Sequence, residues 1–406
     1  MAASVAVALV AGCGRRQKPS ALFVAPNRFD FSANPALLPR LIESPHAYFR
    51  FINREFAAEV CRRFEPLTHA PTVNLHGDAH VEQYAVTDSG RGLTDFDDSA
   101  TGPEVIDLVR MGTSLSLAAD LNGWHERRSE LLDALFDGLR SGIDNPGIRP
   151  APPAVVGRIR KGFDNDRLSL LAAIDTLMDQ QDTQTERLET GIDLYRRAMH
   201  TEYPRLPEWF FRTKTGGRLR VGVGSALDRK YLIRVEGPTT DPGDDLILEA
   251  KEVRDLSGIG CVQRRSGDVF KILSGQSRIA YQPYQYMGYI FLDPDRASGS
   301  ELGSDFWDGT TYWVHAWVDN YQELSIADSF RTPEELAEVV YDIGVQLGRG
   351  HPKDIASPHE SQLRRALIEW LDEHEAAVRV AIADMTGETM VAWRQFRDAA
   401  RRSRPE

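Results

Sequence analysis

Apolar residues recur every three or four positions through most of the first 200 residues, which is the spacing of helices that bury one face. Gly123 and the prolines of residues 146–153 interrupt this pattern, and we expect them to end helices. The pattern therefore predicts a mainly helical lobe over residues 36–212. The helices it predicts cover residues 36–64, 105–121, 126–141, 154–180 and 186–200.

The pattern changes after residue 212. Residues 217–225, 231–235 and 246–250 read as strands between turns that contain Gly or Pro, and residues 312–318, YWVHAWV, alternate as a further strand. Consecutive strands joined by short turns predict a small antiparallel sheet lobe over residues 213–320.

The last part of the chain is helical again. The sequence TPEE opens a helix over residues 332–349 with a capping box and a proline in its first turn. Two amphipathic helices are expected over residues 360–402, separated near Gly387. We expect residues 321–406 to pack on the helical lobe.

Length, charge and cysteine content limit the number of lobes, the partners and the kinds of site that we expect. A chain of 406 residues exceeds one compact core, so two lobes are expected. The formal charge of -12, with no basic stripe, argues against nucleic acid as a partner. Cys13, Cys61 and Cys261 form no closely spaced pair, so we expect neither a disulfide framework nor a cysteine zinc site.

Residues 1–35 are expected to form an N-terminal tail. The tail begins with a small apolar run, and its sequence VAGC resembles the lipobox at which bacterial lipoproteins are acylated, here on Cys13. Residues 1–4 lack the positive charge that such a signal carries. The sequence thus leaves two localisations, cytoplasmic or anchored to a membrane by a lipid on Cys13; no other run reaches membrane-spanning length.

The candidate chemistry lies at the ends of two short strands. Residues 72–75 read as a strand that delivers HGDAH, residues 76–80, onto a loop, and residues 92–94 lead into DFDD, residues 95–98. Gathering carboxylates is costly unless a cation offsets their repulsion. Hard oxygen ligands of this kind favour magnesium or manganese over zinc.

These motifs resemble a known group of enzymes. HGDAHxxQ at residues 76–83 is followed by DFDD, then by a Gly-Pro pair and an Asp-Leu pair before residue 109. This order resembles the catalytic segment of the aminoglycoside and choline kinase group within the protein-kinase-like fold. It resembles still more closely the bacterial domain-of-unknown-function family twenty-two fifty-two. The resemblance is dense over residues 44–119 and thinner over residues 221–350.

The resemblance implies an α+β, two-lobe kinase-like fold whose lobe order is permuted, because the catalytic loop precedes the sheet. It implies that Asp78 accepts or orients the proton of the attacking hydroxyl and that Asp95 holds magnesium against the phosphates of ATP. Gln83 stands where the family has an asparagine that binds a second metal, and Asp97 is a further candidate ligand. Asp107 would tie its helix to the catalytic loop.

The resemblance extends to the predicted sheet. Gly222, Gly224 and Ser225 are similar to a glycine loop that covers phosphates, although a tight hairpin explains the same residues. Lys251, at the end of an apolar strand, is similar to the lysine that grips the nucleotide phosphates. The glutamate that ordinarily pairs with this lysine has no clear counterpart; Gln276 and Arg278 stand in that part of the sequence instead. Residues 312–318 are a candidate hinge against which adenine stacks.

Three functions remain open from the sequence. The first is an ATP- and Mg²⁺-dependent phosphotransferase that acts on an unknown small-molecule or protein acceptor, with His76 and His80 beside Asp78 on the catalytic loop. The second is a kinase-like protein that binds a nucleotide or a partner without catalysis, which Gln83 favours. The third is a metal-dependent hydrolase in which His76, Asp78 and His80 bind the metal and Lys251 has no role.

Overall fold

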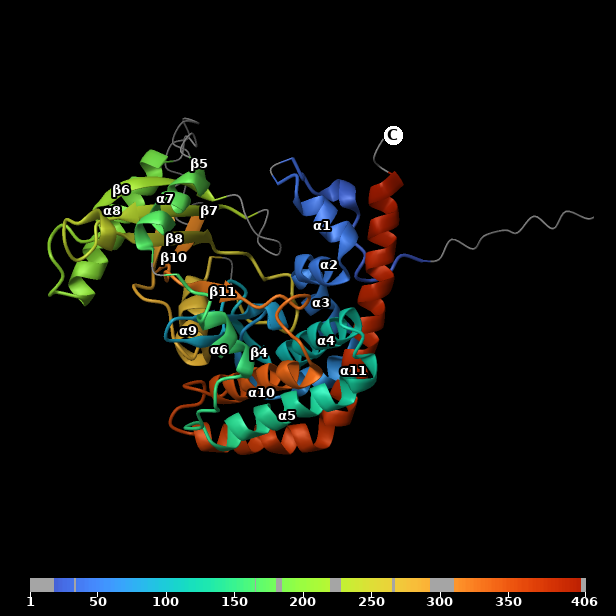
Figure 1. Ribbon diagram of the computed structural model, residues 1–406. Coiled ribbons are helices and arrows are strands. Elements are labelled where there is room, and N and C mark those ends of the chain that lie inside the picture. The colour runs from blue at the N-terminus through green and yellow to red at the C-terminus, as the bar shows by residue number, and fades with distance from the viewer. Residues whose placement is uncertain are drawn as a thin grey trace, which may run out of the picture.

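The chain folds into a sheet lobe and a helical lobe, which lie side by side in Figure 1. The computed structural model describes residues 18–402 except residues 33, 165, 180–184, 220–227, 265–266 and 293–309. Both lobes combine helices with antiparallel strands. The predicted α+β class and the antiparallel sheet are therefore confirmed.

The sheet lobe is built on six strands in the order β5-β6-β7-β8-β10-β9, all paired antiparallel. Three of them coincide with predicted strands that carry alternating or β-branched residues. The strands are β5 (Met178–Asp179), β6 (Thr213–Leu219), β7 (Lys230–Val235), β8 (Leu246–Glu252), β9 (Gly288–Leu292) and β10 (Thr310–Ala316).

Two helices that we assigned to the helical lobe cover this sheet instead. Apolar residues of α7 (Arg167–Leu177) pack with Leu232 and Ile247 on one face, and those of α8 (Thr185–Glu202) pack with Tyr231 and Ile233 on the other. Residues 36–212 therefore do not form one lobe. Helical periodicity shows that a helix has an apolar face, but not which surface covers it.

The helical lobe surrounds α4 (Val105–Leu121), which is buried along most of its length. Its closest helix pair is α5 with α10, where glycines of each helix meet backbone atoms of the other. The Thr332 hydroxyl caps α10 by accepting from the Glu335 N–H, as predicted. The other helices are α1 (Leu37–Glu43), α2 (Pro45–Phe51), α3 (Asn53–Arg63), α5 (Arg128–Asp144), α6 (Ala154–Arg160), α10 (Pro333–Gly350) and α11 (Glu360–Arg402).

The C-terminal segment is one helix, α11, and not the two that we predicted. The hydroxyls of Thr386 and Thr389 donate to carbonyls one turn earlier, Ile382 O and Met385 O, so the helix continues through Gly387. Such hydroxyl contacts bend helices, and Figure 1 shows the two halves of α11 running in different directions. The helix thereby follows two sides of the lobe.

Two small sheets hold the loops of the candidate site. β1 (Thr72–Leu75) pairs with β4 (Ala100–Pro103), and β2 (Tyr84–Thr87) lies between β3 (Arg91–Leu93) and β11 (Tyr321–Glu323). α9 (Val269–Ile279) contacts β1, β4, α10 and β10. Short 3-10 turns cover Pro26–Arg28, Glu65–His69, Val81–Gln83, His125–Arg127 and Pro242–Asp244.

The N-terminal segment differs from the expected tail. Leu22 and Val24 are buried in the main core, and the Ser20 hydroxyl donates to Glu388 of α11. Cys13 and the lipobox-like sequence lie outside the described residues. Among the described helices, none combines the length and the hydropathy that crossing a membrane requires.

A disulfide joins Cys61 of α3 to Cys261 in the segment between β8 and α9, with the two Cα atoms 5.6 Å apart. This corrects our expectation from cysteine spacing. The two residues are 200 positions apart in the sequence, and only the packing of the segment after β8 against α3 brings them together. The disulfide fastens a segment of the sheet lobe to the helical lobe.

We expect Cys61→Ser to lower the free energy of unfolding by about 2–5 kcal/mol, because the cross-link closes a very long loop of the unfolded chain. Chemical unfolding with and without a reductant measures this. Reduction should destabilise the wild type by a similar amount and leave Cys61→Ser unchanged. Equal stability of oxidised wild type and variant would contradict the expectation.

Candidate functional site

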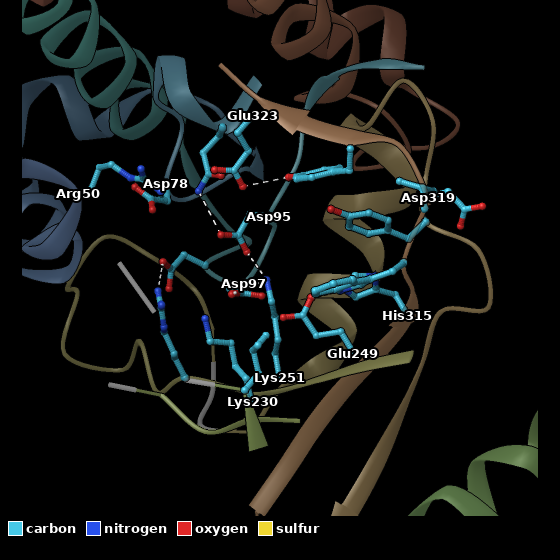
Figure 2. Close-up of a pocket in the computed structure, with 18 of the residues that line it drawn as sticks. Arg50, Asp78, Asp95, Asp97, Lys230, Glu249, Lys251, His315, Asp319 and Glu323 are labelled. Atoms are coloured by element: carbon cyan, nitrogen blue, oxygen red, sulfur yellow. Dashed lines mark hydrogen bonds and ion pairs between the residues drawn. The ribbon is translucent and has the colours of Figure 1, made fainter. Parts of the chain in front are cut away.

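A cavity of about 350 Å³ lies between the two lobes, where the loops after β1 and β3 face the sheet (Figure 2). It contains most of the polar residues predicted from the sequence: Asp78, Gln83, Asp95, Asp97 and Lys251. These residues come from segments up to about 170 positions apart, and the fold brings them to one place.

One end of the cavity is apolar and aromatic. Leu170, Leu219, Trp317 and Tyr284 line it, and the Tyr284 ring stacks on His315 with centroids 4.0 Å apart. Residues 317–320 connect β10 of the sheet lobe to β11, which pairs with strands of the helical lobe. The candidate hinge, residues 312–318, therefore lies in β10 and at the start of the link between the lobes.

Lys251 projects from β8 into the middle of the cavity. Its Nζ lies 2.7 Å from Asp95 Oδ1 and 3.3 Å from Asp97 Oδ2. Burial lowers the pKa of Lys251, but the two carboxylates more than offset it and hold the pKa well above its usual value. Lys251 is thus a fixed positive charge at the site.

The two carboxyl groups beside Lys251 have pKa values that are shifted in opposite directions. Burial and the Asp95 charge raise the pKa of Asp97 to about 8. Burial also acts to raise the pKa of Asp95, but the charge of Lys251 outweighs it and holds that pKa well below its usual value. The Trp313 N–H donates to Asp97 Oδ1 at 2.7 Å.

Gln83 and the two aspartates provide oxygen ligands suited to magnesium. The Gln83 Nε2 group lies 3.4 Å from Asp95 Oδ2, whereas its Oε1 atom is buried and has no hydrogen-bond partner among the described residues. An unpaired buried carbonyl oxygen fits a cation ligand. Among the described residues, no three His, Cys, Asp or Glu side chains form a ready metal site. A metal here would thus need further oxygens, such as those of phosphates.

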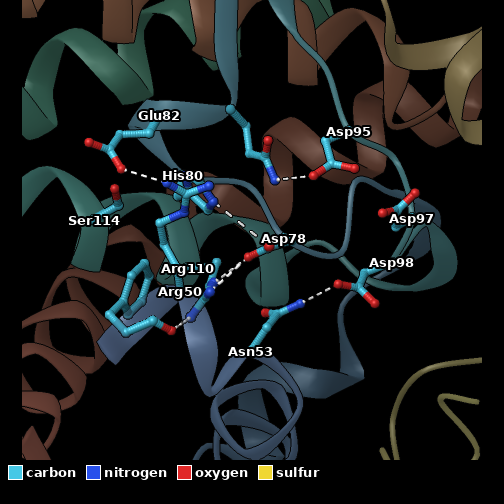
Figure 3. A network of polar contacts seen from close by, with 12 residues as sticks. Arg50, Asn53, Asp78, His80, Glu82, Asp95, Asp97, Asp98, Arg110 and Ser114 are labelled. Atoms are coloured by element: carbon cyan, nitrogen blue, oxygen red, sulfur yellow. Dashed lines mark hydrogen bonds and ion pairs between the residues drawn. The ribbon is translucent and has the colours of Figure 1, made fainter. Parts of the chain in front are cut away.

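Asp78 lies on the loop between β1 and the 3-10 turn at residues 81–83, and it is 5% exposed (Figure 3). Its Oδ1 atom accepts from Arg110 Nε at 2.9 Å and from Arg110 Nη2 at 2.7 Å. Burial raises the pKa of Asp78, and the Arg110 charge opposes that rise. Sequence reasoning missed Arg110, although a single arginine among the apolar residues of α4 is a recognisable signal.

His76 and His80 do not line the cavity. His76 Nε2 lies 2.9 Å from the Thr94 carbonyl oxygen, and the Asp78 N–H donates to His76 Nδ1 at 3.3 Å, so this ring supports the loop. His80 has no hydrogen-bond partner for either ring nitrogen among the described residues, and its Nε2 lies 3.8 Å from Asp78 Oδ2. Burial and nearby positive charges hold the pKa of His80 well below its usual value. The hydrolase interpretation gains no support from this arrangement.

The backbone of the loop at residues 76–80 is held by Asp107, as predicted. Asp107 Oδ2 accepts from the His76 N–H at 2.7 Å, and Oδ1 accepts from the Gly77 N–H at 2.9 Å. Behind it, His351 lies between Asp107 and Glu104, with contacts of 3.1 Å and 2.9 Å. Burial lowers the pKa of His351, but these two carboxylates outweigh it and raise the pKa to about 9.

Gly77 is needed where the two loops meet. Its φ is +83°, and an added Cβ atom would lie 1.9 Å from the Asp98 carbonyl oxygen. Asn53 of α3 joins the same loops, because its Nδ2 donates to the Gly77 carbonyl at 3.0 Å and to Asp98 Oδ2 at 2.9 Å. Arg254 also donates to Asp98 Oδ2, at 2.5 Å. The acidic residues are thus held by contacts from both lobes.

The remaining predictions for the sheet lobe have mixed outcomes. Gly222, Gly224 and Ser225 lie outside the described residues. Gln276 and Arg278 of α9 do not line the cavity, and Arg278 donates to Asn74. Charged residues that we did not predict also line it, among them Lys230, directly opposite Lys251 in the β7–β8 pairing, and Glu249, two positions before Lys251.

Comparison with known proteins yields one match. A family model described as an uncharacterized protein conserved in bacteria (DUF2252) matches residues 33–145, the segment that contains the loops of Asp78 and Asp95. No curated protein and no solved structure matches the chain. The match supports the predicted resemblance to this bacterial family of unknown function.

We expect His351→Gln to lower the free energy of unfolding by about 3 kcal/mol near pH 6, because it removes the positive charge between two buried carboxylates. The pKa of His351 is raised from 6.5 in the unfolded chain to about 9 in the folded chain. Its contribution is therefore complete below about pH 6.5 and is lost as the pH rises through 9.

Unfolding curves of wild type and variant between pH 6 and pH 10 test this expectation. The difference should shrink at high pH, whereas the exposed control His125→Gln should show no such trend. A constant difference across the range would contradict the assigned charge of His351.

Proposed function

We propose that this chain is a kinase-like phosphotransferase with permuted lobe order, which binds Mg²⁺ and ATP between its lobes and transfers the terminal phosphoryl group. The observation that carries this proposal is the convergence of Lys251, Asp95, Asp97 and Gln83 with Asp78 in one cavity. A phosphate-binding cation, metal ligands and a proton acceptor are the groups that phosphoryl transfer requires.

The shape and charge of the cavity suit a nucleotide. The apolar end around Leu170, Leu219 and Trp317 offers a surface for a base, as does the stacked aromatic ring of Tyr284. Lys230, Lys251 and Arg254 line the same cavity and provide positive charge for phosphates. The nucleotide would thus lie with its base near the link between the lobes and its phosphates toward Asp95.

The metal would be held by Asp95, Asp97 and phosphate oxygens, and by Gln83 Oε1 once its amide turns that oxygen toward Asp95 in place of Nε2. When bound, magnesium neutralises charge on the phosphates that it contacts. Lys251 lies between the two aspartates and the sheet, where its ammonium group can donate to a phosphate oxygen. The pKa of Asp97 is raised to about 8 by burial and the Asp95 charge, and a bound metal would favour its carboxylate form.

Asp78 would orient the acceptor hydroxyl and take its proton. The acceptor oxygen forms a bond to the terminal phosphorus, the bond from this phosphorus to ADP breaks, and the proton passes to an oxygen of Asp78. Asp107 keeps the loop of Asp78 in place through the N–H groups of His76 and Gly77. Variable surroundings of the cavity would select the acceptor.

A second candidate is a kinase-like protein that binds nucleotide without turnover. The position of Gln83 favours it, because the Nε2 group and not the carbonyl oxygen lies toward Asp95. Glutamine is also one methylene longer than the asparagine of the related kinases. The phosphotransferase requires Asp78 for turnover of ATP, whereas a protein that only binds nucleotide has no turnover for Asp78 to affect.

We expect Asp78→Asn to lower the rate of magnesium-dependent ATP hydrolysis, with water as acceptor, by about 100-fold or more while the affinity for ATP stays nearly constant. Asp95→Ala should lose both magnesium-dependent binding and turnover. Steady-state kinetics and calorimetric titration measure these effects, with the exposed Asp137→Asn on α5 as a control. Full activity of Asp78→Asn would rule out its role, and nucleotide binding without turnover in the wild type would favour the second candidate.

A further inference from the structure

Arg110 binds only one of the two oxygens of Asp78. Its Nε and Nη2 groups both donate to Oδ1, at 2.9 Å and 2.7 Å. No hydrogen bond from a described residue reaches Oδ2, whose nearest recorded contact is His80 Nε2 at 3.8 Å. One oxygen of Asp78 is therefore fixed, and the other is left for a ligand of the cavity that Asp78 lines.

The guanidinium group itself is held on several sides. Arg110 is 1% exposed in the buried helix α4, and its Nη1 group donates to the Phe49 carbonyl at 3.0 Å. The Cζ atom lies 3.6 Å from the centroid of the Phe49 ring and 5.0 Å from that of Phe56. A planar group packed in this way has one orientation, so it fixes the orientation of the Asp78 carboxylate as well (Figure 3).

Other buried aspartates of this chain provide a comparison. Asp245 is fully buried, and Lys214 and Arg234 donate to its two oxygens at 2.6 Å and 2.7 Å. Asp107 likewise accepts on both oxygens. These two aspartates are structural, and both of their oxygens are used inside the protein. Asp78 differs from these two aspartates and lines the cavity, where its free oxygen would meet a ligand. Asp98 also lines the cavity and leaves Oδ1 without a hydrogen bond among the described residues, but that atom is buried.

We infer that Arg110 is a positioning residue for the proposed phosphotransfer: by donating to Oδ1 it fixes the orientation of the Asp78 carboxylate, so that Oδ2 faces the acceptor hydroxyl. This inference rests on the proposed function. Arg110 does not line the cavity and acts only through Asp78. Lysine in its place would keep the charge but not the two-point contact, because an ammonium group cannot donate through a planar fork.

The charges around Asp78 determine how its titration should respond. Asp98, His76, His80 and Arg50 face it besides Arg110. Burial raises the pKa of Asp78, as does the charge of Asp98, while the charge of Arg110 lowers it. Removal of Arg110 should thus raise the pH at which Asp78 gains a proton, and with it the acidic limb of a rate profile.

The test is the pH profile of magnesium-dependent ATP hydrolysis for wild type, Arg110→Met and Arg110→Lys, together with calorimetric affinities for ATP. We expect Arg110→Met to lower kcat by about tenfold or more, to move the acidic limb to higher pH and to leave the affinity within about twofold. Arg110→Lys should keep the acidic limb near that of wild type and still lose kcat, which separates charge from orientation. If Arg110→Met does not fold, the inference is tested by Arg110→Lys alone, and wild-type kcat in that variant would overturn it.

Two controls distinguish positioning from general stability. Arg158→Met breaks another two-point contact, with Glu335 and away from the cavity, and should leave the pH profile unchanged. In the Asp78→Asn background, Arg110→Met should cause no further loss of turnover.

A further loss of turnover in that double variant, or a wild-type pH profile in Arg110→Met, would overturn the inference and leave the phosphotransferase proposal intact. A wild type that binds ATP without turnover would overturn both, and a wild type that does not bind ATP would remove the nucleotide site itself.

Discussion

The contact of Lys251 with Asp95 and Asp97 is the interaction on which the site depends. It crosses from β8 of the sheet lobe to the loop after β3 of the helical lobe. Several buried carboxylates gather on that loop, and their mutual repulsion would oppose the fold without a cation among them. The same charges that hold the lobes together are therefore the charges that a metal and phosphates would engage.

The segment that follows β8 supports this arrangement from the other side. Arg254 donates to Asp98, and Arg264 donates to the backbone oxygens of Asp97 and Ser99. The disulfide fixes the same segment to α3, because Cys261 lies between Arg254 and Arg264 in the sequence. A covalent link thus supports the segment whose two arginines bind the acidic loop.

Local patterns in the sequence were sufficient to predict many of the helices and strands. Alternating residues located β7, β8 and β10, a capping box located the start of α10, and the two acidic loops were expected at one site. These features depend on neighbours within a few positions. The sequence also correctly related Asp107 to the catalytic loop through its resemblance to a family pattern.

Features that depend on distant packing were not predictable in this way. The pairing of Cys61 with Cys261 and the placement of α7 and α8 on the sheet both require knowledge of which surfaces meet. The contact of Arg110 with Asp78 was missed because the two residues lie 32 positions apart in different elements. His76 and His80 were candidates because they alternate with Asp78 in the HGDAH motif, but both are buried and neither lines the cavity.

We propose that the cavity between the lobes binds a nucleotide together with magnesium. The most direct test of this proposal is a thermal-shift titration of the protein with ATP, with and without magnesium, because a ligand that binds only the native state raises its stability. We expect a magnesium-dependent rise in Tm that is lost in Lys251→Ala. No rise with ATP, combined with a rise with zinc or manganese alone, would contradict the claim.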